Sequence, residues 1–196
     1  MDLFRTWKEE FKMYNPGPES LCLATVSKDC KVSARSVILR KLDEDGFVIV
    51  TDNRSRKVND MDNNRNAAMC FLWTYSNDQQ QKIVKQVRIE GEMVRLEKNE
   101  YQPLYDREPL YCKIRSKICY QGQQVEWNDL KARHDETLEK VYKKEINLAM
   151  PDHFVGYKML PTMMDFYFAR DHLIADRMVY KRLSKESSWT HNRVCA

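Results

Sequence analysis

Strand-like segments occur in two groups separated by one helical block, and this order restricts the fold more than any other feature of the sequence. Short runs rich in β-branched and aromatic residues, bounded by turn residues, mark the strands. Since strands and helices do not alternate, the pattern predicts an α+β fold with a mainly antiparallel, barrel-like sheet and peripheral helices. The helical block covers 98–144, and we predict strands at 21–26, 32–39, 47–51, 67–73, 82–96, 154–160, 163–169 and 177–183.

Turn and capping signals define the shorter elements. Apolar residues recur at helical spacing over 2–13, which predicts an amphipathic helix that ends before Pro16. Ser55 suits the N-cap of a short helix through Met61. The polar stretches expected to form hairpin turns are 28–31 and 43–46.

The chain is long enough for one domain with a substantial hydrophobic core. It has 196 residues, and no internal repeat, linker or low-complexity tract divides it, so we expect residues 1–196 to form a single domain. The net charge of +4 is small, whereas a dedicated nucleic-acid binder usually has a larger clustered excess. The longest apolar run, 67–73, is too short to span a bilayer, and the first residues lack a signal-peptide pattern. We therefore expect a cytoplasmic protein with neither a nucleic acid nor a membrane as partner.

The cysteine, histidine and glycine patterns exclude several kinds of site. None of the 6 cysteines forms a C-x-x-C pair, and the 4 histidines show no H-x-x-x-H spacing, so no metal-ligand set is visible. The 5 glycines are too far apart for a dinucleotide-binding fingerprint or a P-loop. Any phosphate would therefore be held by Arg and Lys side chains rather than by a glycine-rich loop.

Cationic side chains lie on the predicted strands or directly after them. Taken singly, each is best explained by a solvated sheet face or an ion pair at the rim. If several converged at one edge of the sheet, they would form a site for a phosphorylated ligand. Spacing alone leaves both interpretations open. The residues concerned are Arg35, Arg40, Arg56, Lys57, Arg88 and Arg177.

Several motifs occur in a fixed order over nearly the whole chain. The longest are Ser-Ala-Arg-Ser-Val-Ile-Leu-Arg at 33–40, Ser-Arg-Lys at 55–57 and Gln-Val-Arg-Ile-Glu-Gly at 86–91. Each motif alone would recur by chance, but the ordered set is specific. Together they resemble the motifs of the pyridoxine (pyridoxamine) 5′-phosphate oxidase family. Shorter matches to the same family occur at 24–29, 45–47, Thr51, 155–157, 165–166 and 176–177.

The resemblance implies a homodimeric FMN-binding split barrel with two flavin sites at the subunit interface. The cations would face the FMN phosphate, and Gln86 would hydrogen-bond the isoalloxazine ring. Gln121 and Gly122 stand where the family has a Gln-Ser pair from the other subunit, and Tyr167 replaces a Trp beside the flavin. The implied flavin contacts are Arg35, Ser36, Val37, Ile38, Val50, Thr51, Arg56, Lys57, Gln86, Gln121, Gly122, Tyr167 and Arg177.

In this family the reaction is oxidation at the 4′ carbon of pyridoxamine or pyridoxine 5′-phosphate, which yields pyridoxal 5′-phosphate in vitamin B6 metabolism. A hydride passes to flavin N5, O₂ reoxidises the flavin, and hydrogen peroxide leaves. The cofactor supplies the redox chemistry, and the protein orients the substrate. The resemblance therefore implies a flavin oxidase with these small-molecule substrates, and it assigns a catalytic role to no side chain of this sequence.

The substrate half of the family pattern is altered in this chain. The family's phosphate-binding Lys on the second strand is Arg here, which keeps the charge but changes its reach. In the region that corresponds to Y-x-x-S-R-P-x-S-S, Leu110 and Tyr111 replace the paired serines, and Tyr101 is an alternative to Tyr105 as the phosphate-binding Tyr. The residues that the resemblance assigns to the substrate are Arg40, Tyr105 and Arg107.

The family's R-x-H-D-R motif has lost its first two charged residues. Leu173 and Ala175 stand where the family has the Arg and His that hold the substrate over the flavin. Removing a positioned charged contact typically lowers a rate by roughly 10² to 10⁴. We therefore expect retained flavin binding with reduced turnover, unless a residue elsewhere compensates. The alternative is a paralogue that binds FMN or pyridoxal 5′-phosphate as a carrier or regulatory protein.

Overall fold

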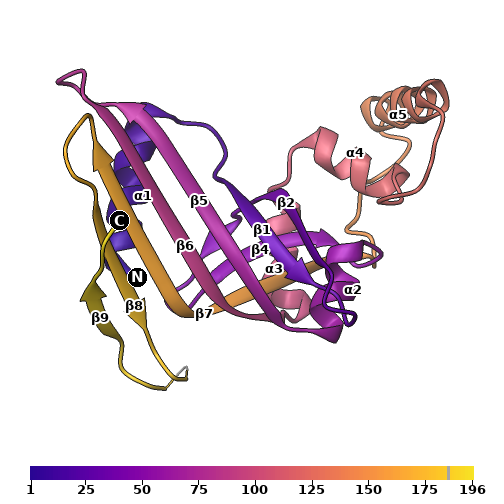
Figure 1. The fold of residues 1–196 in the computed structure, drawn as a ribbon. Coiled ribbons are helices and arrows are strands. Elements are labelled where there is room, and N and C mark those ends of the chain that lie inside the picture. Colours follow the sequence, from indigo (N-terminus) through magenta and orange to yellow (C-terminus); the bar gives the residue numbers. More distant parts are fainter. Residues whose placement is uncertain (185) are drawn as a thin grey trace.

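A curled antiparallel sheet forms the body of the molecule (Figure 1). The computed structural model of the protein describes residues 1–184 and 186–196, and within them the strand order is β2-β1-β5-β6-β7-β4-β3, with β8 on β7 and β9 on β8. Every pairing is antiparallel within that part of the chain. The strands are β1 (Ser20–Val26), β2 (Val32–Ile38), β3 (Lys41–Leu42), β4 (Phe47–Asp52), β5 (Asn66–Ser76), β6 (Lys82–Arg95), β7 (Phe154–Arg170), β8 (Asp176–Lys181) and β9 (Thr190–Arg193).

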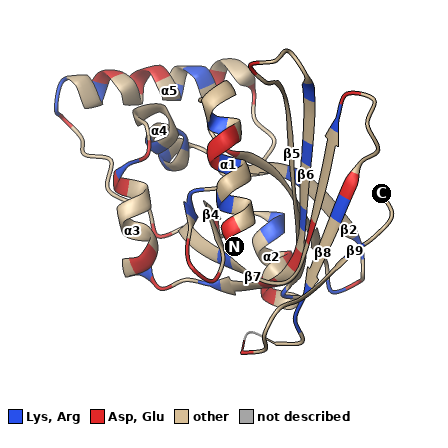
Figure 2. Ribbon diagram, turned by 90° about the vertical axis from the view of Figure 1, so that its left-hand side faces the viewer, with Lys and Arg blue, Asp and Glu red and all other residues tan. Residues whose placement is uncertain are grey.

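The helices differ in their position relative to the sheet. The first helix lies against the sheet, whereas the last two extend away from it, and we call residues 110–142 the helical arm (Figures 1 and 2). No residue of the last helix is buried. Among the described residues, no helix has the length and apolar character needed to cross a membrane. The helices are α1 (Asp2–Tyr14), α2 (Arg56–Asn63), α3 (Lys98–Asp106), α4 (Leu110–Ile118) and α5 (Trp127–Tyr142).

The predicted α+β class is confirmed, but the predicted strands at 154–160 and 163–169 are one continuous strand, β7. Pro161, which lacks a backbone N–H, lies within this strand. In the structure it lies opposite Gly91, at the point where the register between β6 and β7 shifts after Glu90. Such an irregularity accommodates a proline without ending the strand. β7 can therefore pair with β4 through its first half and with β8 through its second half.

Two short strands, β3 and β9, were not predicted from the sequence. β3 contains only Lys41 and Leu42, which is too short for a periodic pattern. β9 consists of exposed residues without apolar alternation, because it is the last strand beyond β8 and covers no core. Pairing with a neighbouring backbone, rather than side-chain burial, defines both strands.

An aromatic cluster joins α1 to the inner face of the sheet. Phe4 is fully buried, and its ring centroid lies 4.9 Å from those of Phe47 and Phe71. Edge-to-face contacts at this distance add to the free energy of burial. Along β6, Val87 and Ile89 point into the same core. Because side chains alternate along a strand, Gln86, Arg88 and their neighbours across the sheet emerge on the opposite, outer face.

Candidate functional site

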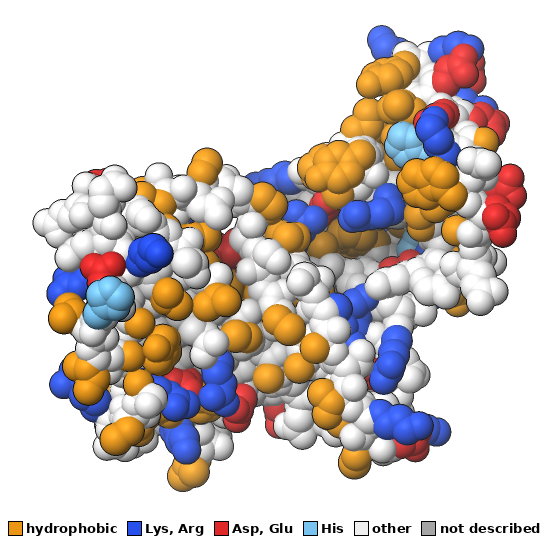
Figure 3. Space-filling model, turned by 45° about the horizontal axis from the view of Figure 1, so that its top comes forward, with side chains coloured by type: hydrophobic (Ala, Val, Ile, Leu, Met, Phe, Trp, Pro, Cys, Tyr) orange, Lys and Arg blue, Asp and Glu red, His pale blue; other side chains and the backbone are white. Residues whose placement is uncertain are grey.

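A cavity of about 570 Å³ lies between the sheet and the helical arm. Figure 3 shows the surface hollowed beneath the arm, with Lys and Arg side chains gathered around the hollow. At this cavity, Cys112, Arg115 and Ser116 of α4 and the C-cap residue Cys119 are spaced i, i+3, i+4 and i+7, so one face of the helix forms a wall. The lining residues are Arg35, Ser36, Val37, Ile38, Arg40, Val50, Thr51, Asp52, Lys57, Glu108, Cys112, Arg115, Ser116, Cys119, Gln121, His153 and Phe154.

Lys57 is the most deeply buried cation of this cavity. Its Nζ donates to Thr51 Oγ1 at 3.1 Å and to Gln121 Oε1 at 3.0 Å, and within the described residues it makes no ion pair. Only 5% of the residue is exposed. Burial, with a smaller contribution from the positive charge of Arg35, lowers the pKa of Lys57 to about 8. The cavity thus contains an ammonium group whose charge is poorly compensated.

A buried carboxylate, Asp60, orients two further cations. Asp60 Oδ2 accepts a hydrogen bond from Thr25 Oγ1 at 2.8 Å and lies 4.0 Å from Arg35 Nη2 and 3.9 Å from Arg56 Nε. The Arg35 guanidinium also donates to the Leu23 carbonyl oxygen at 3.1 Å and to Thr25 Oγ1 at 2.8 Å. Arg35 lines the cavity, whereas Arg56 is exposed beside it.

The beginning of α2 has an unsatisfied polar atom. Ser55 Oγ is buried and has no hydrogen-bond partner among the residues that the structure describes. Ser55 precedes the first turn of α2, and Lys57 belongs to that turn. A helix N-terminus, an available hydroxyl and an uncompensated ammonium are groups that stabilise a phosphate. The residues present therefore fit the phosphate of a cofactor such as FMN.

Arg40 lines the same cavity but is neutralised. Its Nη2 lies 2.8 Å from Glu108 Oε1 and 3.0 Å from Glu108 Oε2. The Glu108 side chain is 4% exposed, and that of Arg40 is 28% exposed. This ion pair joins the segment between β2 and β3 to the segment between α3 and α4.

A second group of polar residues lies on the outer face of the sheet. Gln86 on β6 is the register partner of Tyr167 on β7, which is in turn the partner of Arg177 on β8. Arg177 Nη2 and Nε donate to the buried Asp165 carboxylate at 2.7 and 3.0 Å, and Arg88 Nη1 lies 3.4 Å from it. We call these five residues the sheet-face cluster.

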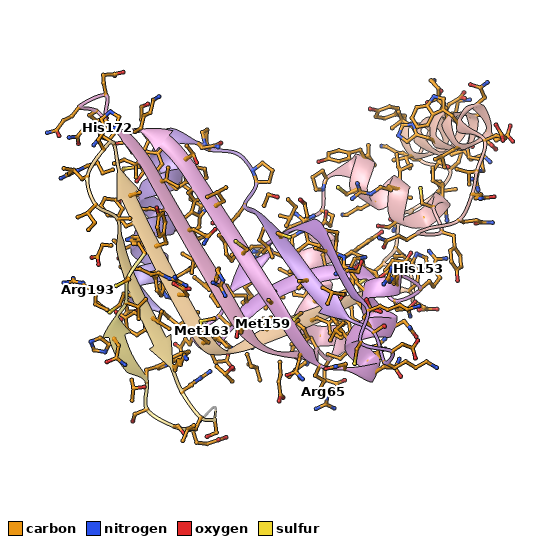
Figure 4. The ribbon with its side chains drawn as sticks, in the orientation of Figure 1. Arg65, His153, Met159, Met163, His172 and Arg193 are labelled. Atoms are coloured by element: carbon orange, nitrogen blue, oxygen red, sulfur yellow. The ribbon has the colours of Figure 1, made fainter. Side chains whose placement is uncertain are left out.

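The two groups are separate on a single chain. Arg88, Asp165 and Arg177 line a different cavity of about 450 Å³. In Figure 4, His153 of the first cavity lies below the helical arm, and Arg193, next to β8, lies at the opposite side of the sheet. Each group holds part of the flavin contacts implied by the sequence.

The implied flavin contacts lie partly at the first cavity and partly in the sheet-face cluster. The residues from β2, β4 and α2 line the first cavity, except for Arg56 at its edge. Gln121 also lines it and bonds Lys57 of its own chain, whereas the resemblance implied a position in the other subunit. Gly122, with φ +86°, forms the exposed turn that follows and is absent from the lining. Gln86, Tyr167 and Arg177 belong to the sheet-face cluster.

The implied substrate contacts are not brought together. Arg40 lines the cavity, but Tyr105 is buried and its hydroxyl donates to the carbonyl oxygens of Leu148 and Ala149 at 3.2 and 3.1 Å. Tyr101, the alternative, is buried against Phe154. Arg107 is exposed and is not part of the lining.

The face of α4 that lines the cavity and both carboxylates of the cavity were not predicted from the sequence. Helical spacing of Cys112, Arg115, Ser116 and Cys119 was visible, but a polar helix face usually contacts solvent. Glu108 and Arg40 are 68 residues apart, so no local pattern connects them. The remaining missed residues that line the cavity are Asp52, His153 and Phe154.

The fold is an α+β split β-barrel. A solved structure from Nostoc punctiforme, described as a pyridoxamine 5′-phosphate oxidase-related, FMN binding protein, matches with a TM-score of 0.75 at 17% identity over 98% of this chain and 97% of that one. PhzG from Burkholderia lata, solved in complex with tetrahydrophenazine-1-carboxylic acid, matches with a TM-score of 0.83 at 24% identity. The match covers 100% of this chain and 91% of PhzG. At these identities the likeness concerns the fold alone.

The sequence comparisons define the family. Residues 7–141 match the family described as Pyridoxamine 5′-phosphate oxidase. A pyridoxine/pyridoxamine 5′-phosphate oxidase of Salinibacter ruber is 32% identical over 99% of this chain and 87% of its own length. A pyridoxine/pyridoxamine 5′-phosphate oxidase of Cupriavidus pinatubonensis is 30% identical over 95% of this chain and 84% of its own length. The chain belongs to the pyridoxamine 5′-phosphate oxidase family.

Proposed function

We propose that this protein is an FMN-dependent oxidase that converts pyridoxamine or pyridoxine 5′-phosphate into pyridoxal 5′-phosphate, with O₂ as acceptor and hydrogen peroxide as product. The observation that carries the proposal is the buried Lys57 at the start of α2, which lacks an ion-pair partner among the described residues and lies in a cavity large enough for ligands. The names of the relatives supply the reaction class.

The residues of the cavity have distinct roles in this proposal. Lys57 and the Ser55 hydroxyl hold the FMN phosphate, and Arg35 and Arg56, oriented by Asp60, add positive charge around it. When bound, FMN supplies the two-electron oxidation that side chains alone do not perform. The protein binds and orients the reactants and excludes water from between them.

A second copy of the chain completes the site in this proposal. Gln86, Tyr167 and Arg177 present polar and aromatic groups suited to a flat ring, yet they do not line the phosphate cavity of their own chain. Leu72, the β5 neighbour of Gln86, is 63% exposed, and Trp127 on the helical arm is 72% exposed. Apolar groups exposed in this way favour burial against a partner surface. We therefore infer a homodimer with one flavin between each cavity and the partner's sheet-face cluster.

The flavin spectrum of the purified protein tests the proposal. We expect yellow protein with about one FMN per chain and a dimeric mass in solution. Under anaerobic conditions, pyridoxamine 5′-phosphate should bleach the flavin absorbance, and admission of air should restore it with release of peroxide. Protein that takes up no FMN, or whose flavin is not reduced by either proposed substrate, contradicts this function.

A second candidate, a ligand-binding paralogue with little turnover, is favoured by the loop between β7 and β8. Leu173 and Ala175 carry no charge there, and Leu173 is 58% exposed. If the second candidate is correct, the double variant Leu173→Arg and Ala175→His should raise turnover by about 10². Family-like turnover by the unmodified protein would exclude it.

A further inference from the structure

The Arg40–Glu108 ion pair leaves one end of the cavity without the positive charge that Arg40 alone would give it. Both Glu108 oxygens lie within 3.0 Å of one guanidinium nitrogen. Glu108 is nearly inaccessible to solvent, and Arg40 is its only ion-pair partner among the described residues. An incoming anion could engage Arg40 fully only by leaving this buried carboxylate unpaired, which is unfavourable.

The rest of the cavity offers few other partners for an anion at this end. Arg35 is already bonded to Leu23 and Thr25, and Asp52 is paired with Arg54 outside the lining, at 2.6 Å. Arg115 is exposed on α4. Lys57 is therefore the buried cavity cation without a carboxylate partner in the described part of the chain.

The cavity would bind the phosphate of FMN and the phosphate of a substrate with unequal strength. Lys57 and Ser55 would hold the phosphate of FMN. A second dianion would bind away from that phosphate, because like charges repel. At the Arg40 end, the second dianion would meet an ion pair with no net charge. Tyr105 and Arg107 do not compensate, because the Tyr105 hydroxyl is bonded to backbone carbonyls and Arg107 lies outside the lining.

We propose that Glu108 is a specificity-determining residue: by neutralising Arg40, it removes most of the binding contribution of a substrate phosphate. The protein consequently accepts the unphosphorylated amine or alcohol nearly as well as the corresponding 5′-phosphate. This inference rests on the proposed function, since it concerns the substrate that meets the bound flavin. Arg40 binds substrate phosphate strongly only when a neutral residue replaces Glu108.

The test compares pyridoxamine 5′-phosphate with pyridoxamine on the FMN-loaded protein. The ratio of their kcat/KM values for flavin reduction should lie within about threefold of one for the unmodified protein. In Glu108→Gln, the ratio should rise at least about tenfold through the phosphorylated compound alone. Glu9→Gln on α1, which removes an exposed ion-paired carboxylate away from the cavity, should leave the ratio unchanged.

A double variant keeps the test decisive if Glu108→Gln does not fold. Arg40→Met with Glu108→Leu replaces the pair by apolar side chains of similar size, which folded proteins commonly tolerate. Its ratio should equal that of the unmodified protein. A double variant that loses a preference for phosphate present in the unmodified protein would show that Arg40 binds phosphate despite Glu108, and it would overturn the inference.

The two proposals fail in different ways. If neither compound reduces the flavin, the proposed function is wrong, and the dissociation constants of pyridoxal 5′-phosphate and pyridoxal then test Glu108 by the same ratio and the same variants. If the flavin is reduced but the unmodified protein prefers the phosphorylated compound more than about a hundredfold, or Glu108→Gln leaves the ratio unchanged, Glu108 has no such role.

Discussion

One cation in each half of the candidate flavin site, Lys57 in the cavity and Arg177 on the sheet face, differs in how its charge is compensated. In the cavity, Lys57 is buried with only neutral hydrogen-bond partners, whereas on the sheet face Arg177 donates two hydrogen bonds to the buried Asp165. The first cation makes no ion pair within the described residues, so a bound anion would supply a direct counter-charge. The second is already satisfied and has remaining donors for neutral polar atoms. The comparison indicates that the cavity contributes affinity for an anion and that the sheet-face cluster contributes orientation.

Replacing Lys57 by Met should cause the largest loss of FMN binding. Hydrogen bonds to a charged group are worth about 3 kcal/mol at most, so the dissociation constant for FMN should rise about 100-fold. The FMN-free protein should be as stable as the unmodified one or more stable, because the variant removes a desolvated charge. Fluorescence titration with FMN and urea unfolding measure the two effects.

Lys28→Met is the matched control for this variant. Lys28 is an exposed lysine in the turn between β1 and β2, so its replacement should change neither quantity. A Lys57→Met protein that is destabilised and binds FMN normally would mean that Lys57 has a structural role, and the contrast between the two halves would be wrong.

Replacing Arg177 by Met should mainly affect stability. It leaves the Asp165 carboxylate, which is 4% exposed, with Arg88 at 3.4 Å as its one remaining ion-pair partner among the described residues. We expect a lower free energy of unfolding, with a smaller loss than for a fully buried pair because Arg177 itself is partly exposed. The added change Asp165→Asn should restore most of it. Urea unfolding of the three proteins checks this, and a double variant as unstable as Arg177→Met would refute the explanation.

The sheet was largely predictable from the sequence because its signals are local. Alternation along 82–96 identified β6, and the turn residues at 28–31 separated β1 from β2. The division of β7 was wrong, because Pro161 fits into a register shift that depends on the partner strand. Irregularities of this kind arise from pairing between distant segments and leave no periodic mark.

The candidate site was less predictable, because it depends on which cations have partners. Arg56 and Lys57 are neighbours in the sequence, yet the helical turn of α2 exposes the first and buries the second. Glu108 was not considered, since its contact with Arg40 joins segments 68 residues apart. The flavin contacts themselves stay predictions, whereas the fold and the family are confirmed.

The pH dependence of FMN binding tests whether Lys57 lacks a counter-charge in the FMN-free protein. Burial lowers the pKa of Lys57 to about 8, so the FMN-free protein loses this charge above that pH while the unfolded chain keeps it. The folded state then binds fewer protons, and stability rises with pH by up to about 1.4 kcal/mol per unit between the two pKa values. FMN affinity should fall up to about tenfold per unit in the same window. Both slopes should be absent in Lys57→Met, and a slope that persists there would assign them to another group.

Arg56→Met should have the smallest effect, and its salt dependence distinguishes the exposed cation from the buried one. The Arg56 side chain is 59% exposed and lies 3.9 Å from Asp60, so its contribution to FMN binding is largely screened. We expect the dissociation constant to rise about threefold at low salt and not at all at about 1 M salt, where the Debye length is about 3 Å. The Lys57→Met effect should persist at high salt, because its partners exclude solvent. Equal salt dependence of the two variants would mean that both cations meet the phosphate at the surface, and the cavity would then not be its binding site.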